Sequence, residues 1–252
     1  MRSRVAINGA TALVTGAGSG IGRATATRLA GRGARILAVD LDEVTAKTTA
    51  ALCVDAGVES VAYTCDVRDR DAVADLASQV EREHGAVDIL VNSAGVGMSG
   101  RFLDMSLDDW EWIRSVNLDG IVHCCHAFGP GMLERGRGHV ANLSSGLAYM
   151  PSAMTPAYST TKAAVLMFSR AIRADWATAG VGVSAICPGV INTPIINATR
   201  FVGALDGDRA RRMASRGFAR GHSPDIVARA IVGAIEHNRG IVPVGVESVV
   251  GW

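Results

Sequence analysis

The sequence predicts an α/β fold: a doubly wound parallel sheet of about seven strands with helices on both faces. Short, continuously apolar runs alternate along the chain with longer amphipathic stretches. Strands without a polar face are expected where helices cover both sides of a parallel sheet. A chain of 252 residues can bury a large core, and neither a linker nor an internal repeat divides it. We therefore expect a single domain over residues 1–252.

The apolar runs and the stretches between them set the expected order of elements. Apolar runs predict strands and amphipathic stretches predict helices, in the alternation of parallel strands joined by helical crossovers. Strands are expected at 11–14, 35–39, 59–64, 87–91, 139–143, 181–186 and 241–244, and helices at 23–30, 42–56, 69–84, 106–135, 156–179 and 223–238.

One segment interrupts this alternation: residues 194–222, from Pro194 to His222, lack a clear periodicity. The segment follows the strand expected at 181–186, and loops beyond the carboxyl ends of such strands bind ligands. We expect a substrate lid here; a solvated, arginine-rich surface helix is the alternative. The arginines could also bind a phosphate or carboxylate of the substrate. They are Arg200, Arg209, Arg211, Arg212, Arg216 and Arg220.

Composition and charge argue against several classes of protein. With 25 Lys and Arg against 24 Asp and Glu, the formal net charge is +1, so a nucleic-acid-binding protein is not expected. A content of 48% hydrophobic and 19% charged residues argues against disorder. No apolar run is long enough to cross a membrane, and residues 1–8 lack the apolar stretch of a signal peptide. The 5 scattered cysteines do not suggest a disulfide framework, so we expect a soluble, cytoplasmic protein.

A glycine-rich turn joins the first expected strand to the first helix. Residues 15–22 read Thr-Gly-Ala-Gly-Ser-Gly-Ile-Gly, a T-G-x-x-x-G-x-G pattern and not G-x-G-x-x-G. Such a turn lets backbone N–H groups approach a pyrophosphate at the N-terminus of a helix, as in a Rossmann-like site. A plain tight turn is the alternative.

Asp40 ends the second expected strand and indicates which cofactor binds. A carboxylate at this place accepts hydrogen bonds from the adenosine ribose hydroxyls and repels a 2′-phosphate. Ser19 and Leu41 bring no positive charge nearby, so NAD is favoured over NADP. Alternatively, Asp40 only caps the next helix, a role that Asp42 could also fill.

Three polar residues form a candidate catalytic set. Tyr158 and Lys162 lie four positions apart in the helix expected at 156–179, so they share one face. An ammonium beside a phenol lowers the pKa of the phenol, which makes Tyr158 a candidate acid and base near neutral pH. Ser145 follows the strand expected at 139–143 and could reach a substrate oxygen beside Tyr158. Taken singly, the pair could arise by chance and the serine could belong to a turn.

In this order, and over nearly the whole chain, the motifs resemble those of the short-chain dehydrogenase/reductase family. The family's usual Asn-Asn-Ala-Gly is Asn-Ser-Ala-Gly here, with Ser93 as a mild departure. The resemblance implies a set of cofactor-binding residues and a set of catalytic residues. The former are Gly16, Ser19, Gly20, Ile21, Gly22, Asp40, Asp66, Val67, Asn92, Ala94, Gly95, Tyr158, Lys162, Pro188, Gly189, Ile191 and Thr193, and the latter are Asn117, Ser145, Tyr158 and Lys162.

The resemblance also implies a role for each catalytic residue. Tyr158 gives a proton to a carbonyl or takes one from an alcohol, and Ser145 hydrogen-bonds the same oxygen. Lys162 binds the nicotinamide ribose and lowers the pKa of Tyr158. Asn117 positions a water molecule that connects Lys162 to bulk solvent.

For the cofactor, the resemblance implies contacts at both of its ends. Asp66 and Val67 contact the adenine. Thr193 and the backbone at 190–191 hold the carboxamide of the nicotinamide. The cofactor carries the hydride chemistry, and the protein orients and polarises the reactants.

We therefore expect an oxidoreductase that interconverts a secondary alcohol and a ketone by hydride transfer with NAD(H), on a mainly apolar small molecule. An NADPH-dependent ketoreductase of lipid or polyketide metabolism is the alternative within the class. A non-catalytic dinucleotide-binding protein is the alternative outside it. Apolar residues near the catalytic positions belong either to the substrate pocket or to the core. They are Met98, Leu147, Tyr149, Met150 and Met154.

Two further features concern metals and partners. In the run 123–126, His-Cys-Cys-His, four adjacent helical positions cannot converge on one ion, so no metal is expected. The apolar residues 249–252 are expected to pack on a partner subunit. The resemblance implies a homotetramer, or else a homodimer.

Overall fold

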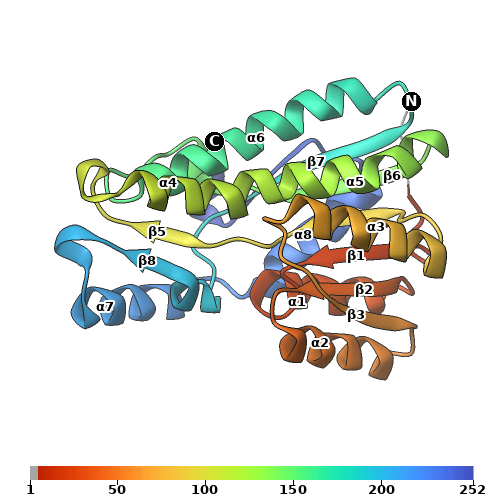
Figure 1. The fold of residues 1–252 in the computed structure, drawn as a ribbon, viewed down its shortest axis with the longest axis horizontal. Helices are drawn as coiled ribbons and strands as arrows, with labels where there is room; N and C mark the ends of the chain where they lie inside the picture. The colour runs from red at the N-terminus through yellow and green to blue at the C-terminus, as the bar shows by residue number, and fades with distance from the viewer. Residues whose placement is uncertain (1–4, 252) are drawn as a thin grey trace.

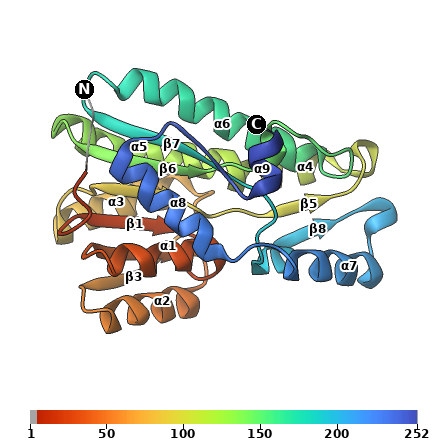
Figure 2. The same ribbon diagram turned by 180° about the vertical axis from the view of Figure 1, so that it is seen from behind.

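The computed structural model describes residues 5–251 and contains a seven-stranded parallel sheet with the order β3-β2-β1-β4-β6-β7-β9. Helices lie on both faces, which confirms the predicted fold class (Figures 1 and 2). The strands are β1 (Thr11–Thr15), β2 (Arg35–Asp40), β3 (Ser60–Thr64), β4 (Ile89–Asn92), β6 (Gly138–Leu143), β7 (Val181–Pro188) and β9 (Ile241–Val244). The main helices are α1 (Gly20–Ala30), α2 (Glu43–Asp55), α3 (Arg70–His84), α4 (Leu107–Arg114), α5 (Gly120–Glu134), α6 (Pro156–Trp176) and α8 (Pro224–His237).

Alternate residues of the central strands enter two separate cores. On β1, Ala12 and Val14 pack with residues of α1, α2 and α8, whereas Leu13 packs with residues of α3, α5 and α6. All three side chains are fully buried. Burying a valine or leucine side chain contributes roughly 1.5–3 kcal/mol, and both faces of these strands are buried, which explains why the strands carry no polar face.

The order of strands reverses at the middle of the sheet. From β1 the chain moves outward through β2 and β3, then returns to β4 on the other side of β1 and moves outward in the opposite direction. A crevice opens beyond the carboxyl ends of the strands at such a reversal, and this is where open α/β sheets bind ligands.

The helix expected at 106–135 is not one regular helix. After α4 comes a π turn at Ser115–Asp119, and only then does α5 begin. A π turn changes which side chains face inward, and such turns are frequent at functional sites. Here it accompanies the complete burial of Asn117. The stretch is helical as predicted, and the π turn is the one feature within it that the sequence did not predict.

Beside the main sheet lies a second, small sheet that the sequence did not predict. Its two parallel strands are β5 (Gly97–Ser99) and β8 (Thr199–Phe201). A side chain at Gly97 would collide with Thr199 Oγ1, so this approach requires glycine. Strand β8 belongs to the segment 194–222, together with the 3₁₀ helix η4 (Pro194–Ala198) and helix α7 (Asp208–Ala219). Figures 1 and 2 show β5, β8 and α7 together at one end of the molecule.

The chain ends in a short helix, α9 (Val246–Gly251). Val249 and Val250 of the apolar tail are largely exposed, and Trp252 lies outside the described residues. Within residues 5–251, no helix is both long enough and apolar enough to cross a membrane.

Candidate active site

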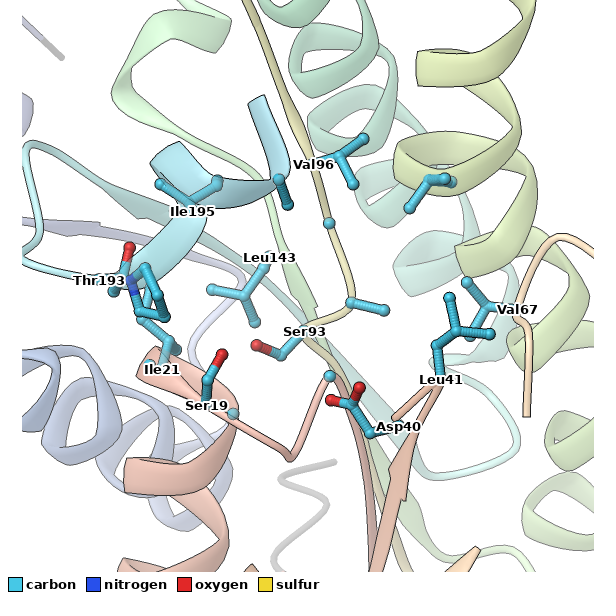
Figure 3. A pocket seen from close by; sticks show the side chains of 18 of the residues that line it. Ser19, Ile21, Asp40, Leu41, Val67, Ser93, Val96, Leu143, Thr193 and Ile195 are labelled. Carbon is cyan, nitrogen blue, oxygen red and sulfur yellow. The ribbon is translucent and has the colours of Figure 1, made fainter. Parts of the chain in front are cut away.

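A cavity of about 490 Å³ opens beyond the carboxyl ends of the central strands. Figure 3 shows side chains from the glycine-rich turn, from the ends of several strands and from η4 around it. Most of the residues expected at the cofactor site line this cavity. They are Gly16, Ser19, Gly20, Ile21, Gly22, Asp40, Asp66, Val67, Ala94, Gly95, Tyr158, Lys162, Pro188, Gly189, Ile191 and Thr193.

The glycine-rich turn has no room for a side chain at its first glycine, Gly16, or at its last, Gly22. Gly16 has φ +63°, and a Cβ there would lie 2.8 Å from Ala94 Cα. A Cβ on Gly22 would collide with Gly16 O. Ser19 is the N-cap residue of α1 and its side chain makes no capping hydrogen bond, so it leaves the first N–H groups of the helix, which begins at the cavity, without a side-chain cap. A helix N-terminus of this kind fits a pyrophosphate.

Asp40 supports the turn and faces the cavity (Figure 3). Its Oδ2 accepts a hydrogen bond from Gly18 N at 2.8 Å, and its Oδ1 accepts one from Asp42 N at 3.1 Å. The cap of α2 is Asp42, whose side chain accepts from Val44 N and Thr45 N. Capping of α2 therefore does not account for Asp40, whose carboxylate lines the cavity.

The sequence analysis did not predict that Cys65 and Arg68 line the cavity; Leu41, considered there only for its lack of charge, also lines it. Arg68 grips the Asp66 carboxylate, with its Nε 3.0 and 2.9 Å from the two oxygens. The hydrogen bonds from Arg68 are the main reason that the pKa of Asp66 lies below its usual value. Asp66 therefore stays ionised, as an acceptor at the rim of the expected adenine site.

Asn92 does not line the cavity, although it was expected to bind the cofactor. Its side chain is buried below the cavity floor, where Nδ2 donates to Asn142 Oδ1 at 2.8 Å. Asn142 Nδ2 in turn donates to Ser169 Oγ at 3.0 Å, which links β4, β6 and α6. The neighbouring loop is held by Thr15 Oγ1, which accepts from the backbone N–H groups of residues 93 and 94. Asn92 therefore supports the site from within the core.

The three residues of the candidate catalytic set meet at the cavity wall. Lys162 is buried, its Nζ lies 5.6 Å from the centroid of the Tyr158 ring, and it donates to Leu143 O at 2.8 Å. A hydrogen bond connects the side chains of Ser145 and Tyr158. Ser145 Oγ also accepts from Leu147 N at 3.2 Å. The predicted juxtaposition of a hydroxyl, a phenol and an ammonium is present.

The pKa values of this set differ from the expectation. Burial raises the pKa of Tyr158 above its ordinary value, and the hydrogen bond with Ser145 opposes the rise. Burial also lowers the pKa of Lys162 from 10.5 to about 8. The ammonium donates to Leu143 O, and no influence of Lys162 offsets the burial of the phenol. The lowering of the Tyr158 pKa by Lys162 is therefore not found.

Asn117 is placed behind the cavity wall by the π turn. Its Oδ1 accepts from Val96 N at 2.9 Å, and its Nδ2 donates to Val96 O at 3.0 Å and lies 3.4 Å from Thr161 Oγ1. A Cβ on Gly95 would lie 3.3 Å from Asn117 Oδ1 and 3.6 Å from Lys162 Nζ. Asn117 and Lys162 therefore flank the same glycine, although Asn117 itself does not line the cavity.

The far end of the cavity is apolar. Its walls come from the strand–helix loops, from α4 and from the segment 194–222, and Figure 3 shows Val96 and Ile195 on this side. Met98, Leu147, Tyr149, Met150 and Met154 do not line the cavity, and Met98 packs in a core with Met105 and Ile113. The residues that form the apolar end are Val96, Trp112, Val116, Ile195, Ala198 and Phe218.

None of the six arginines of the segment 194–222 lines the cavity. The guanidinium of Arg200 stacks on Trp112, 3.8 Å from the ring centroid, and its Nη1 lies 3.0 Å from Asp109 Oδ1. Arg211 lies over the Phe201 ring. The segment thus contributes its apolar side chains to the cavity and leaves these arginines outside it.

The side chains of the run 123–126 point to different surroundings, and His126 is exposed. His123 Nδ1 is 3.0 Å from Val67 O, and Cys124 and Cys125 are buried. All five cysteines are free. Among the described residues, no group of three or more His, Cys, Asp or Glu side chains is arranged to hold a metal ion.

Known proteins of one family resemble this chain. The family model for short chain dehydrogenases matches residues 10–201. The probable oxidoreductase EphD of Mycobacterium tuberculosis is 46% identical over 243 residues, which are 93% of this chain and 41% of that protein. This chain therefore spans less than half the length of EphD. The D-threitol dehydrogenase of Mycolicibacterium smegmatis is 41% identical over 75% of this chain and 73% of that protein.

Among solved structures, a short chain dehydrogenase/reductase from Burkholderia phymatum in complex with NAD superposes with a TM-score of 0.86. It is 29% identical, over 94% of this chain and 89% of the other. The fold and the comparisons with relatives and solved structures agree on one family. The chain belongs to the short-chain dehydrogenase/reductase family.

Proposed function

We propose that this protein interconverts a secondary alcohol and a ketone on a mainly apolar small molecule, with NAD(H) as its cofactor. The observation that carries the proposal is the meeting of Ser145, Tyr158 and Lys162 in one cavity with the glycine-rich turn and Asp40. The bound cofactor supplies or accepts the hydride. The protein supplies a proton, a polarised oxygen site and the orientation of both reactants.

Tyr158 is the proposed acid and base. A phenol that burial keeps protonated is suited to donate its proton to a ketone oxygen as that oxygen becomes negative. The hydroxyl of Ser145 shares a hydrogen bond with Tyr158, so both can bind the same substrate oxygen. In the reverse direction Tyr158 must first lose its own proton, and the phenolate then takes the proton of the alcohol.

Lys162 and Asn117 serve the proton supply in this proposal. Lys162 titrates at a pKa of about 8, which lets it exchange protons near neutral pH, and it would also bind the nicotinamide ribose. Asn117 and Lys162 both lie near the position that a Cβ on Gly95 would take, and Asn117 would hold a water molecule between Lys162 and solvent. Asn92 acts only through the packing of the cavity floor.

The preference for NAD over NADP rests on Asp40. Its carboxylate would accept hydrogen bonds from the ribose diol and would repel a 2′-phosphate. Arg68, a cation in the cavity lining, is engaged by Asp66. The NAD complex of the Burkholderia phymatum relative supports the same preference. An NADPH-dependent ketoreductase remains the second candidate.

The substrate, the lid and the assembly are also part of the proposal. The apolar end of the cavity favours an apolar substrate, and Ile195, Ala198 and Phe218 make the segment 194–222 its lid.

The exposed valines of α9 fit a surface between subunits of a homotetramer or homodimer. Free, buried cysteines fit a cytoplasmic protein.

A screen of secondary alcohols with NAD tests the proposal, with the absorbance of reduced nicotinamide as the readout. The matching ketones with NADH test the reverse direction, and NADP(H) is run in parallel. We expect turnover with NAD(H), and a kcat/KM that rises with the apolar area of the alcohol. Turnover with NADP(H) alone would establish the second candidate instead. Binding of both cofactors without any turnover would indicate a non-catalytic dinucleotide-binding protein.

A further inference from the structure

The C-terminal helix α9 folds back onto the loop that follows β7. Ser248 is buried, and its Oγ donates to Cys187 O at 2.6 Å at the end of β7. Tyr149, in the loop after Ser145, donates to Ser248 O at 2.8 Å. Figure 2 shows α9 toward the end of the molecule where β8 and α7 lie. The last described residues of the chain are therefore part of the surroundings of the cavity.

Glu247 lies in a space that two glycines leave open. A Cβ on Gly189 would collide with the Glu247 carboxylate, and a Cβ on Gly245 would lie 3.2 Å from Glu247 Oε2. Gly245 also has φ +93°, a backbone conformation that disfavours other residues. Because Gly189 and Gly245 have no side chains, the Glu247 carboxylate can approach the backbone that follows β7.

Within this space the carboxylate has two partners. Glu247 Oε1 accepts a hydrogen bond from Val190 N at 2.6 Å, and Oε2 lies 3.3 Å from His222 Nε2. Partial burial tends to raise the pKa of Glu247, but backbone hydrogen bonds, among them that from Val190, together with His222 outweigh it and hold the pKa below its ordinary value. Glu247 is therefore ionised near neutral pH.

The two partners, Val190 and His222, are also hydrogen-bonded to each other through their backbones. His222 N donates to Val190 O at 2.9 Å, and Asn192 N donates to His222 O at 2.8 Å, so the His222 backbone brackets Ile191. Ile191 lines the cavity together with Gly189 and Thr193. Glu247 thus fixes the cavity-lining loop 189–193 from behind, and through His222 it ties that loop to the end of the segment 194–222.

We propose that Glu247 is a positioning residue for the nicotinamide half of the cofactor. It acts through Val190 and His222 and keeps the backbone at 191 and the Thr193 side chain in place for the nicotinamide carboxamide. The inference rests on the proposed function, because it requires a nicotinamide cofactor in this cavity. The adenosine half binds at the glycine-rich turn, Asp40 and Asp66, and does not depend on Glu247.

Calorimetric titration with two probes, NADH and ADP-ribose, tests the inference. ADP-ribose lacks only the nicotinamide ring, so a loss seen with NADH and not with ADP-ribose reports on the binding of that ring. In Glu247→Ala the Val190 N–H loses its acceptor, so we expect NADH affinity to fall at least about tenfold and ADP-ribose affinity to stay within about twofold. Glu247→Gln keeps an acceptor oxygen for Val190 N and should recover most of the NADH affinity.

Two further variants complete the experiment. His222→Ala removes the second partner of the carboxylate and should weaken NADH alone, about threefold, even if Glu247→Ala fails to fold. Glu236→Ala, which loses only a surface ion pair with Arg32, should change neither affinity. Equal losses for NADH and ADP-ribose, or no loss for either, would overturn the role of Glu247. Failure of the wild-type protein to bind either probe would contradict the proposed function itself.

Discussion

Lys162 and Tyr158 share one face of α6, with the Lys162 Nζ 5.6 Å from the centroid of the Tyr158 ring. One helical turn separates them, so the helix itself fixes their spacing. The ammonium is anchored on Leu143 O, at the end of the strand that also leads to Ser145. A single strand–helix unit therefore brings all three candidate catalytic residues together.

Tyr158→Phe removes one oxygen atom and leaves the ring in place. If Tyr158 is the acid and base, turnover should fall by about 10²–10⁴-fold while NADH affinity stays within about twofold. Steady-state kinetics and an NADH titration measure the two quantities. Tyr63→Phe is the matched control, because the Tyr63 hydroxyl binds Glu83 and His84, which lie outside the cavity lining. A Tyr158→Phe protein with wild-type turnover would exclude the role.

Burial of Lys162 predicts a pH-dependent stability. Its pKa is lowered from 10.5 to about 8 in the folded protein, so between these pH values the unfolded chain binds more protons and stability rises with pH. Below about pH 8 Lys162 is charged in the folded protein as well, so burial of the charge lowers the stability by its full amount. Methionine does not titrate at this position. The stability of Lys162→Met minus that of the wild-type protein should therefore be larger near neutral pH than at pH 10.5, by up to about 3 kcal/mol.

Urea unfolding of the wild-type and Lys162→Met proteins across this pH range measures that difference. The account requires the difference between the two proteins to shrink steadily as the pH rises. If the stability difference stays constant across this pH range, burial does not lower the pKa of Lys162.

The geometry of the glycine-rich turn predicts that alanine at Gly22 weakens NADH binding, whereas alanine at Gly31 does not. A Cβ on Gly22 would collide with Gly16 O, a backbone atom that cannot move aside without opening the turn. Gly31, at the end of α1, has φ −63°, and its nearest neighbour would be Thr27 O at 3.6 Å. Gly22→Ala should therefore weaken NADH binding at least about tenfold, whereas Gly31→Ala should bind normally. Equal affinities in the two variants would contradict the close packing of the turn.

The contact between Arg200 and Trp112 predicts an effect on substrate alone. Arg200 stacks on Trp112, which lines the apolar end of the cavity, and pairs with Asp109. Stacking of this kind contributes about 0.5–2 kcal/mol, so Arg200→Ala should raise KM for the alcohol severalfold and leave NADH affinity unchanged. Arg212→Ala, which loses only an exposed pair with Asp208, is the control. An unchanged KM in Arg200→Ala would contradict a link between the segment 194–222 and the substrate site.

Most of the fold was predictable because it depends on local patterns. The alternation of apolar strands and amphipathic helices has a clear period, and the residues after strand ends, such as Asp40 and Ser145, reach one edge by topology. Tyr158 and Lys162 were predictable because the spacing within a helix is fixed. These residues all line the cavity as expected.

What the sequence did not predict depends on contacts between distant residues. Strands β5 and β8 are three residues each and pair across a separation of about a hundred residues, which no periodicity reveals. The π turn around Asn117 changes the helix by a single residue. Trp112 and Phe218 line the cavity only because α4 and α7 meet it in space. Asn92 matched the family motif, yet the pleat of β4 directs its side chain into the core.

Parallel titration of the wild-type and Asp40→Asn proteins with NADH and NADPH tests the central claim most directly. Asparagine keeps an oxygen for Gly18 N but removes the charge that would repel a 2′-phosphate. We predict that the wild-type protein binds NADH at least about tenfold more tightly than NADPH, and that Asp40→Asn narrows this gap. Equal or tighter binding of NADPH by the wild-type protein would contradict the claim that this is an NAD-dependent oxidoreductase.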